Sequence, residues 1–246
     1  MRPLTIFRHI ACEGPAYLAE VLDRHAIPWR LVRIDEHEPV PDTLDDCSGL
    51  VFMGGPMSVN DPLPWIEQEL SLIRRAQAEN MPVLGHCLGG QLICKALGGT
   101  ISANPVKEIG WHRVRKCNTP AADRWLAGLP DEATLFHWHG ETFSIPDGAG
   151  VILESEHCAH QAFAIGNTLA LQCHVEMLPP MVAEWAALYA HELQETSTTV
   201  QSAAQMTADL PARIAAAQQV ADRLYQRWLA PLRQIAPEST QSIPKT

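Results

Sequence analysis

The chain has 246 residues, of which 46% are hydrophobic and 19% are charged, and its formal net charge is −10. This length and composition suit a soluble domain with a sizeable core. The acidic balance argues against a nucleic-acid partner, because phosphate contacts need a basic surface, and no apolar stretch approaches the length of a membrane span.

The first predicted element is a buried strand at residues 4–9. Charged residues interrupt residues 1–9 too early for a signal peptide. The seven cysteines are odd in number and lack the spacing of a disulfide framework, which is typical of a reducing compartment. The sequence therefore predicts a cytoplasmic protein.

Apolar runs alternate with helical patterns in the first hundred residues. Further strands are predicted at residues 31–34, 50–53 and 82–85. Helices are predicted between them at residues 16–26 and 65–80. Because strands that alternate with helices form βαβ units, this half of the chain predicts a parallel sheet.

Cys87 lies at the turn between the last of these strands and a helical pattern that begins at Leu88. Gly85 and Gly89 flank it and permit a strained backbone, as in a nucleophile elbow that presents a reactive side chain at the carboxyl edge of a sheet. The following helix N-terminus favours the thiolate. A lone cysteine is more often a buried structural residue, but the flanking glycines favour a nucleophile here.

After residue 99 the pattern changes to short strand-like runs separated by turns. These runs cover residues 110–117, 134–138, 151–155, 161–165 and 168–172. They predict a more antiparallel second half that returns the chain towards Cys87, closed by a helix at about residues 180–192.

His174 and Glu176 follow the last of these runs. Residues two apart in an extended segment lie on the same side. A thiol nucleophile needs a base to move its proton, and that base needs a carboxylate to hold its tautomer and stabilise the imidazolium. Together with the elbow, the spacing predicts a Cys87–His174–Glu176 catalytic triad without a metal ion.

Four blocks of the sequence resemble the class I (triad-type) glutamine amidotransferases, and most of all the free-standing relatives of the GMP synthase amidotransferase domain. The blocks are residues 53–59, 85–91, 136–141 and 172–176. The resemblance implies a three-layer, flavodoxin-like α/β domain with a mostly parallel central sheet. It also implies hydrolysis of the glutamine side-chain amide through a cysteine thioester, giving glutamate and ammonia without a cofactor.

The resemblance also implies roles for individual residues. The backbone N–H groups of Gly55 and Leu88 are expected to form the oxyanion hole. Gln91 and the loop with His139 and Gly140 are expected to position the substrate. This substrate is glutamine or a γ-glutamyl small molecule, and the ammonia acceptor is expected on a synthetase partner protein.

The sequence departs from the family pattern beside the nucleophile. His86 stands where the family commonly has an apolar residue, and Gly90 replaces a larger one. Three alternatives therefore stay open: a γ-glutamyl peptide or amide hydrolase with the same triad, a non-catalytic binding or regulatory domain, and another elbow-cysteine family of the DJ-1 or dienelactone-hydrolase type. The close His-x-Glu pair argues against the last.

The eleven histidines raise the question of a metal site. His137 and His139 form a His-x-His pair, but no nearby carboxylate or cysteine completes a familiar ligand spacing, so no metal is expected. The sequence also lacks a Gly-x-x-x-x-Gly-Lys phosphate loop and a Ser-Gly-Gly-Val-Asp-like pyrophosphatase signature. We therefore expect no ATP-using synthetase within this chain.

The C-terminal part is expected to be an accessory element, so the amidotransferase domain is placed at residues 1–195 and a separate segment at 196–246. Residues 195–207 are polar and predict a linker, and residues 235–246 predict a disordered tail. Between them an apolar stripe predicts one amphipathic helix, which can pack on its own domain or form a homodimer. The stripe comprises Leu210, Ile214, Ala217, Ala221, Leu224 and Trp228.

Overall fold

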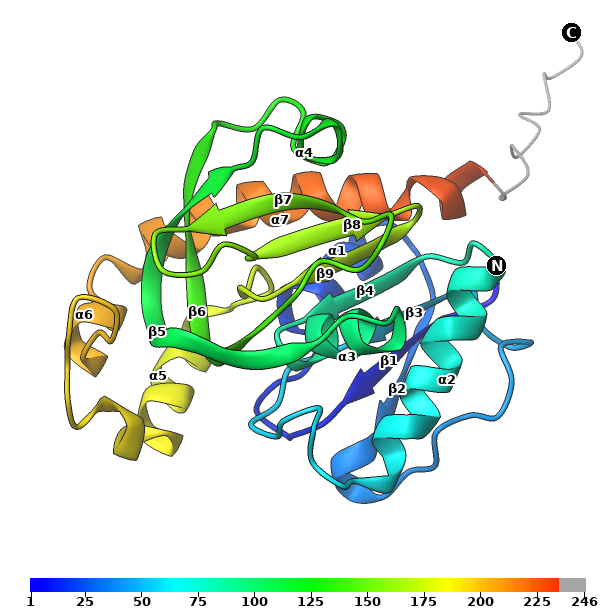
Figure 1. The fold of residues 1–246 in the computed structure, drawn as a ribbon, viewed down its shortest axis with the longest axis horizontal. Coiled ribbons are helices and arrows are strands. Elements are labelled where there is room, and N and C mark those ends of the chain that lie inside the picture. Colours follow the sequence, from blue (N-terminus) through cyan, green and yellow to red (C-terminus); the bar gives the residue numbers. More distant parts are fainter. Residues whose placement is uncertain (235–246) are drawn as a thin grey trace, which may run out of the picture.

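In the computed structural model, which describes residues 1–234, the apolar runs of the sequence form one nine-stranded sheet (Figure 1). Its strand order is β2-β1-β3-β4-β9-β8-β7-β5-β6. The strands are β1 (Leu4–Arg8), β2 (Trp29–Arg33), β3 (Gly49–Phe52), β4 (Val83–His86), β5 (Ile101–Lys116), β6 (Glu132–Phe143), β7 (Gly150–Ser155), β8 (Ala162–Ile165) and β9 (Thr168–Leu171).

The helices begin where the sequence offers start signals. Proline occupies the first turn of α2, α4 and α5, where its missing N–H costs no hydrogen bond. The helices are α1 (Ala16–Arg24), α2 (Pro64–Ala78), α3 (Leu88–Ala96), α4 (Pro120–Trp125), α5 (Pro179–Leu188), α6 (Ala203–Thr207) and α7 (Leu210–Gln234), with short 3-10 turns η1 (Ile34–Glu36) and η2 (Ala190–Leu193).

The sheet has a parallel and an antiparallel half. Strands β2, β1, β3, β4 and β9 run parallel, as the alternating pattern of the first half predicts. Strands β8, β7, β5 and β6 pair antiparallel. The central sheet is therefore mixed, and β9 joins the two halves by pairing with β4 and β8.

Side chains alternate across the sheet and supply two cores. Ile6 and Val51 pack with α1 and α7 on one face, whereas Phe7 and Phe52 pack with α2 and α3 on the other. The rings of Phe7 and Phe52 stack at 4.7 Å. Figure 1 shows the resulting three layers of helix, sheet and helix.

The C-terminal segment packs against its own chain. The α7 side chains of Leu224, Tyr225 and Trp228 are almost fully buried, and α7 contacts α1 and β6. The stretch expected to be a linker also makes ordered contacts, since Val200 forms a β-bridge with Ile109. The domain boundary at residue 195 remains a prediction.

Two further expectations concern the ends and the surroundings of the chain. The tail predicted at residues 235–246 lies outside the described residues. Within the described part, none of the helices combines the length and apolar character that crossing a membrane requires.

Candidate active site

Cys87 lies at the junction of β4 and α3 with φ 49° and ψ −107°, a conformation rare for a residue with a side chain. Close packing accounts for its glycine neighbours. A Cβ at Gly89 would collide with the backbone of Phe52, and one at Gly90 would collide with the Leu171 carbonyl group at the end of β9. The departure from the family pattern at Gly90 therefore has a steric cause.

His174 and Glu176 follow β9, and their side chains meet. The Nδ1 atom of His174 lies 2.6 Å from Oε1 of Glu176. The backbone N–H of His174 donates to the Phe136 carbonyl oxygen on β6 at 2.8 Å, which anchors the segment. With Nδ1 bound to the carboxylate, Nε2 is the ring nitrogen left to exchange a proton with a nucleophile.

Charges inside this buried group shift its titration. Burial lowers the pKa of His174, but the Glu176 carboxylate and the Cys87 side chain outweigh burial and raise that pKa well above its ordinary 6.5. Burial would raise the pKa of Glu176, yet His86 and His174 lower it to about 2. The arrangement therefore favours an imidazolium beside a carboxylate, the charge state that stabilises a neighbouring thiolate.

The Cys87 sulfur borders a cavity of about 380 Å³. The Nε2 atom of Gln172 lies 3.6 Å from this sulfur and can donate to it. The cavity lining also includes Gly55, Gln91 and His174. The nucleophile thus opens into a space of the size that small ligands occupy.

The other predicted site residues surround this cavity at different depths. His139 and Gly140 also line it. Leu88 does not line it, but it is the first residue of α3 and its side chain packs beside Gly55. Glu176 lies behind His174. The structure thus brings the predicted residues together at the carboxyl edge of the parallel strands.

Gln91 and His139 already have partners inside the protein. The amide of Gln91 donates to Oε1 of Gln172 at 3.2 Å. The Nδ1 atom of His139 lies 3.0 Å from the Glu141 carbonyl oxygen. Both side chains therefore shape the wall of the cavity, and direct substrate contacts by them remain a prediction.

Glu13 is a cavity residue that the sequence did not identify. It follows β1, and its carboxyl group is buried and borders the cavity near His174. The Tyr189 hydroxyl donates to it at 3.4 Å. Burial raises the pKa of Glu13 to about 7; His174 opposes this rise and Glu176 adds to it. No motif marks Glu13, because its environment comes from distant parts of the chain.

His86, the second departure from the family pattern, links the triad to α7. Its Nε2 atom lies 3.0 Å from the Tyr225 hydroxyl and 3.7 Å from Oε2 of Glu176. Burial lowers the pKa of His86, although Glu176 opposes the change. A neutral histidine therefore stands between the carboxylate of the triad and the C-terminal helix.

Comparison with known proteins agrees with this geometry. The family profile described as glutamine amidotransferase class-I matches residues 17–180, which include the elbow and the His-x-Glu pair. The chain belongs to the class I glutamine amidotransferase family. This amidotransferase is 33% identical over 187 residues to the glutamine amidotransferase-like protein YfeJ of Salmonella typhimurium, a match that covers 73% of this chain and 76% of YfeJ.

A solved structure extends the likeness along most of the chain. The amidotransferase is 45% identical to a glutamine amido transferase from Methylobacillus flagellatus, with a TM-score of 0.90 and coverage of 94% of this chain and 95% of that one. It is also 31% identical over 144 residues to a glutamine-hydrolyzing GMP synthase of Porphyromonas gingivalis. That match covers 57% of the amidotransferase but only 27% of the GMP synthase.

Proposed function

We propose that this amidotransferase hydrolyses the side-chain amide of glutamine through a thioester on Cys87. The observation that carries the proposal is the strained Cys87 at the edge of the cavity, with a His174–Glu176 pair of 2.6 Å beside it. A nucleophile, a proton carrier and an orienting carboxylate are the parts that covalent acyl transfer requires.

In the first half of the reaction, the Cys87 thiolate attacks the amide carbon. The carbonyl oxygen becomes an oxyanion, which the backbone N–H groups of Gly55 and Leu88 stabilise. Donors of this kind are each worth roughly 3 kcal/mol of transition-state stabilisation. His174 then gives its proton to the leaving nitrogen, so that ammonia departs and the glutamyl group stays on sulfur.

In the second half, His174 acts as a base. It takes a proton from water, the resulting hydroxide attacks the thioester carbon, and the carbon–sulfur bond breaks to give glutamate and the thiolate. Glu176 holds the His174 ring through both halves. Gln172 supports the thiolate with its amide N–H group, which lies 3.6 Å from the sulfur.

The released ammonia needs an acceptor. The GMP synthase relative is described as glutamine-hydrolyzing and is much longer than the aligned region. We propose that a separate synthetase protein uses the ammonia in this case. The same triad also serves the hydrolysis of other γ-glutamyl amides, so the substrate must be measured.

The test is a substrate panel on the purified chain. Glutamine and γ-glutamyl amides of different amines are supplied, and glutamate, ammonia and free amine are quantified for wild type and Cys87→Ser. We expect release by wild type alone and covalent labelling of Cys87 by a glutamine-mimicking electrophile. Labelling of the half-buried Cys12 or the buried Cys94 in place of Cys87 would contradict the proposal.

A further inference from the structure

A second polar cluster lies on the β5–β6 hairpin, outside the triad. Glu108 on β5 is the cross-strand partner of His139 on β6. His137 is two residues before His139, so its side chain leaves the same face of the strand. All three side chains are buried, and their ligand atoms lie within 4.8 Å of one another.

We propose that Glu108, His137 and His139 form a binding site for a transition-metal dication, most simply Zn²⁺. Two imidazoles and one carboxylate suit Zn²⁺, Co²⁺ or Fe²⁺, whereas Mg²⁺ and Ca²⁺ prefer sites made of oxygen atoms alone. Three protein ligands leave the fourth tetrahedral position to water or another small ligand.

His139 faces Glu108 with the nitrogen that a metal would use. Its Nδ1 lies 3.0 Å from the Glu141 carbonyl oxygen, so Nδ1 carries a proton and donates it there. The lone pair of Nε2 in the neutral ring then faces Oε2 of Glu108 at 3.1 Å. Two acceptors at this separation require a cation or an extra proton between them, and ligand atoms around tetrahedral Zn²⁺ are about 3.3 Å apart.

His137 distinguishes between these two explanations. The ring is fully buried, and within residues 1–234 neither of its nitrogens has a hydrogen-bond partner. Leaving a buried polar group unpaired costs about 1–3 kcal/mol. A proton between His139 and Glu108 would leave this cost in place, whereas a metal ion would give His137 a partner.

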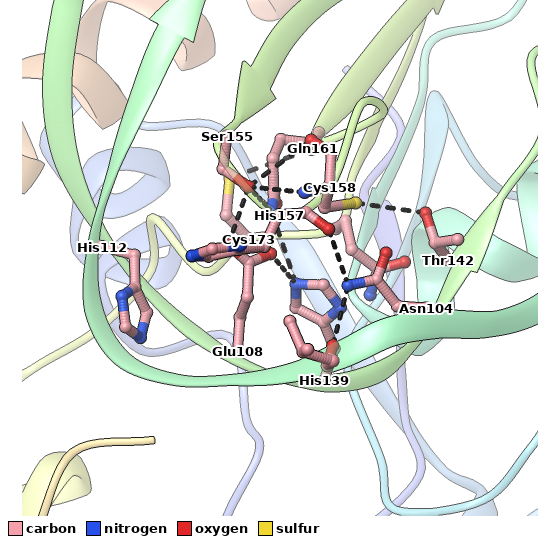
Figure 2. Close-up of polar contacts among 12 residues, drawn as sticks. Asn104, Glu108, His112, His139, Thr142, Ser155, His157, Cys158, Gln161 and Cys173 are labelled. Atoms are coloured by element: carbon pink, nitrogen blue, oxygen red, sulfur yellow. Dashed lines mark hydrogen bonds and ion pairs between the residues drawn. The ribbon is translucent and has the colours of Figure 1, made fainter. Parts of the chain in front are cut away.

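Polar neighbours hold the carboxylate in the orientation that a ligand needs. Figure 2 shows Ser155 and Gln161 directed at Glu108. The Ser155 hydroxyl donates to Oε1 at 2.7 Å, and the Gln161 amide donates to Oε2 at 2.6 Å. Such outer partners are characteristic of metal sites, where they orient the ligands and tune affinity.

The cluster also has a route to solvent and a connection to the catalytic cavity. Glu108 borders a separate depression of about 1200 Å³ that also contains Ser155 and His157. His139 borders the catalytic cavity. A bound metal would tie β5 to the residues around Gly140 and thereby hold one wall of that cavity in place.

The experiment measures metal binding directly. Metal-stripped protein in a Cys87→Ser background, which removes the reactive thiol, is titrated with Co²⁺ while visible absorption is recorded, and Zn²⁺ is then added in competition. We expect one equivalent of Co²⁺ with the intense bands of a four-coordinate site, displaced by one equivalent of Zn²⁺. Zn²⁺ should also raise the melting temperature.

Three variants assign the site. Glu108→Gln and His137→Ala should each weaken Zn²⁺ binding by more than about 100-fold, because loss of an outer partner alone costs 10–100-fold. His157→Ala, in the same depression, should bind as the parent does. The proposal is overturned if the parent binds no metal in a 1:1 ratio. It is equally overturned if binding survives in folded Glu108→Gln, or if His157→Ala abolishes it.

Discussion

At the scale of residues, the active site depends on charges that are buried together. His174, Glu176 and Glu13 are each almost completely shielded from solvent. Their mutual interactions outweigh burial for the first two, whereas burial dominates for Glu13. A proton carrier is therefore set between one carboxylate that stays ionised and another that titrates near neutral pH.

The roles of the triad predict a rank order of variants. Cys87→Ala and His174→Ala should each abolish almost all turnover, because both groups serve one proton-transfer step. Glu176→Gln should keep roughly 10- to 100-fold more activity than Cys87→Ala, since it orients the base without reacting itself. Steady-state ammonia release measures the order. A folded Glu176→Gln as inactive as Cys87→Ala would show that the carboxylate does more than orient.

Glu13 predicts a pH-dependent stability. Its folded-state pKa of about 7 exceeds the ordinary value of 4.5, so the folded protein holds this proton more tightly than the unfolded chain does. The contribution of Glu13 to the free energy of unfolding therefore falls as pH rises from 4.5 to 7. Relative to wild type, Glu13→Gln should be more stable at pH 8 than at pH 5, by up to roughly 3 kcal/mol.

Urea unfolding at both pH values tests this expectation. The exposed Glu20 on α1 supplies the matched control, because Glu20→Gln should change stability equally at the two pH values. A Glu13→Gln effect independent of pH would show that the carboxyl group does not titrate in this range.

Local signals explain which site residues could be predicted. Cys87 has flanking glycines and a following helix, and His174 and Glu176 are two residues apart, so both patterns lie within a few positions. Glu13 lacks such a signal, because Tyr189 and His174 come from the other end of the domain. Glu108 was missed as a neighbour of His139 for the same reason, since only the pairing of two strands brings them together.

At the scale of elements, α7 is part of the domain that carries the triad. Its Asp222 accepts a hydrogen bond from Tyr17 on α1 at 2.9 Å, and its Tyr225 reaches His86 beside the nucleophile. An amphipathic pattern predicts such a helix, but it does not say which surface covers the apolar stripe. The contact with His86 follows from the fold alone.

Removing the C-terminal segment should therefore unfold or loosen the domain. Burying each large side chain of the stripe contributes about 1.5–3 kcal/mol, so truncation after residue 195 should lower the melting temperature strongly. Because the stripe packs within the chain, the truncated protein should show no dimer-to-monomer change by light scattering. A truncated chain with an unchanged melting temperature would contradict this assignment of α7.

A milder substitution separates stability from the contact with the triad. Tyr225→Phe removes only the hydroxyl group that pairs with His86, which should cost about 1 kcal/mol of stability. The exposed Gln226 on the same helix provides a control, and Gln226→Ala should leave the melting temperature nearly unchanged.

At the scale of the whole molecule, the predicted parts were those that repeat a simple pattern. Strands β1, β3 and β4 are short apolar runs between helices, so the parallel half could be predicted. The long β5–β6 pair was foreseen only in pieces, because Pro105 and Gly110 interrupt its pattern and a register shift separates residues 103 and 108. This irregular pair supplies a wall of the catalytic cavity.

The size of the chain leads to the final prediction. A glutaminase that ran freely would consume glutamine without a product that needs ammonia, and the chain aligns with only 27% of a GMP synthase. We therefore expect weak turnover of free glutamine by the isolated chain, with either a strong increase when an acceptor system is added or a preference for another γ-glutamyl amide. The measurement compares kcat/KM for glutamine and for the amide panel, with and without cell extract depleted of small molecules, using Cys87→Ala to subtract background. High unassisted turnover at modest glutamine concentration would contradict both branches, because it would mean that the cavity is already complete and that no partner or alternative amine is needed to organise it.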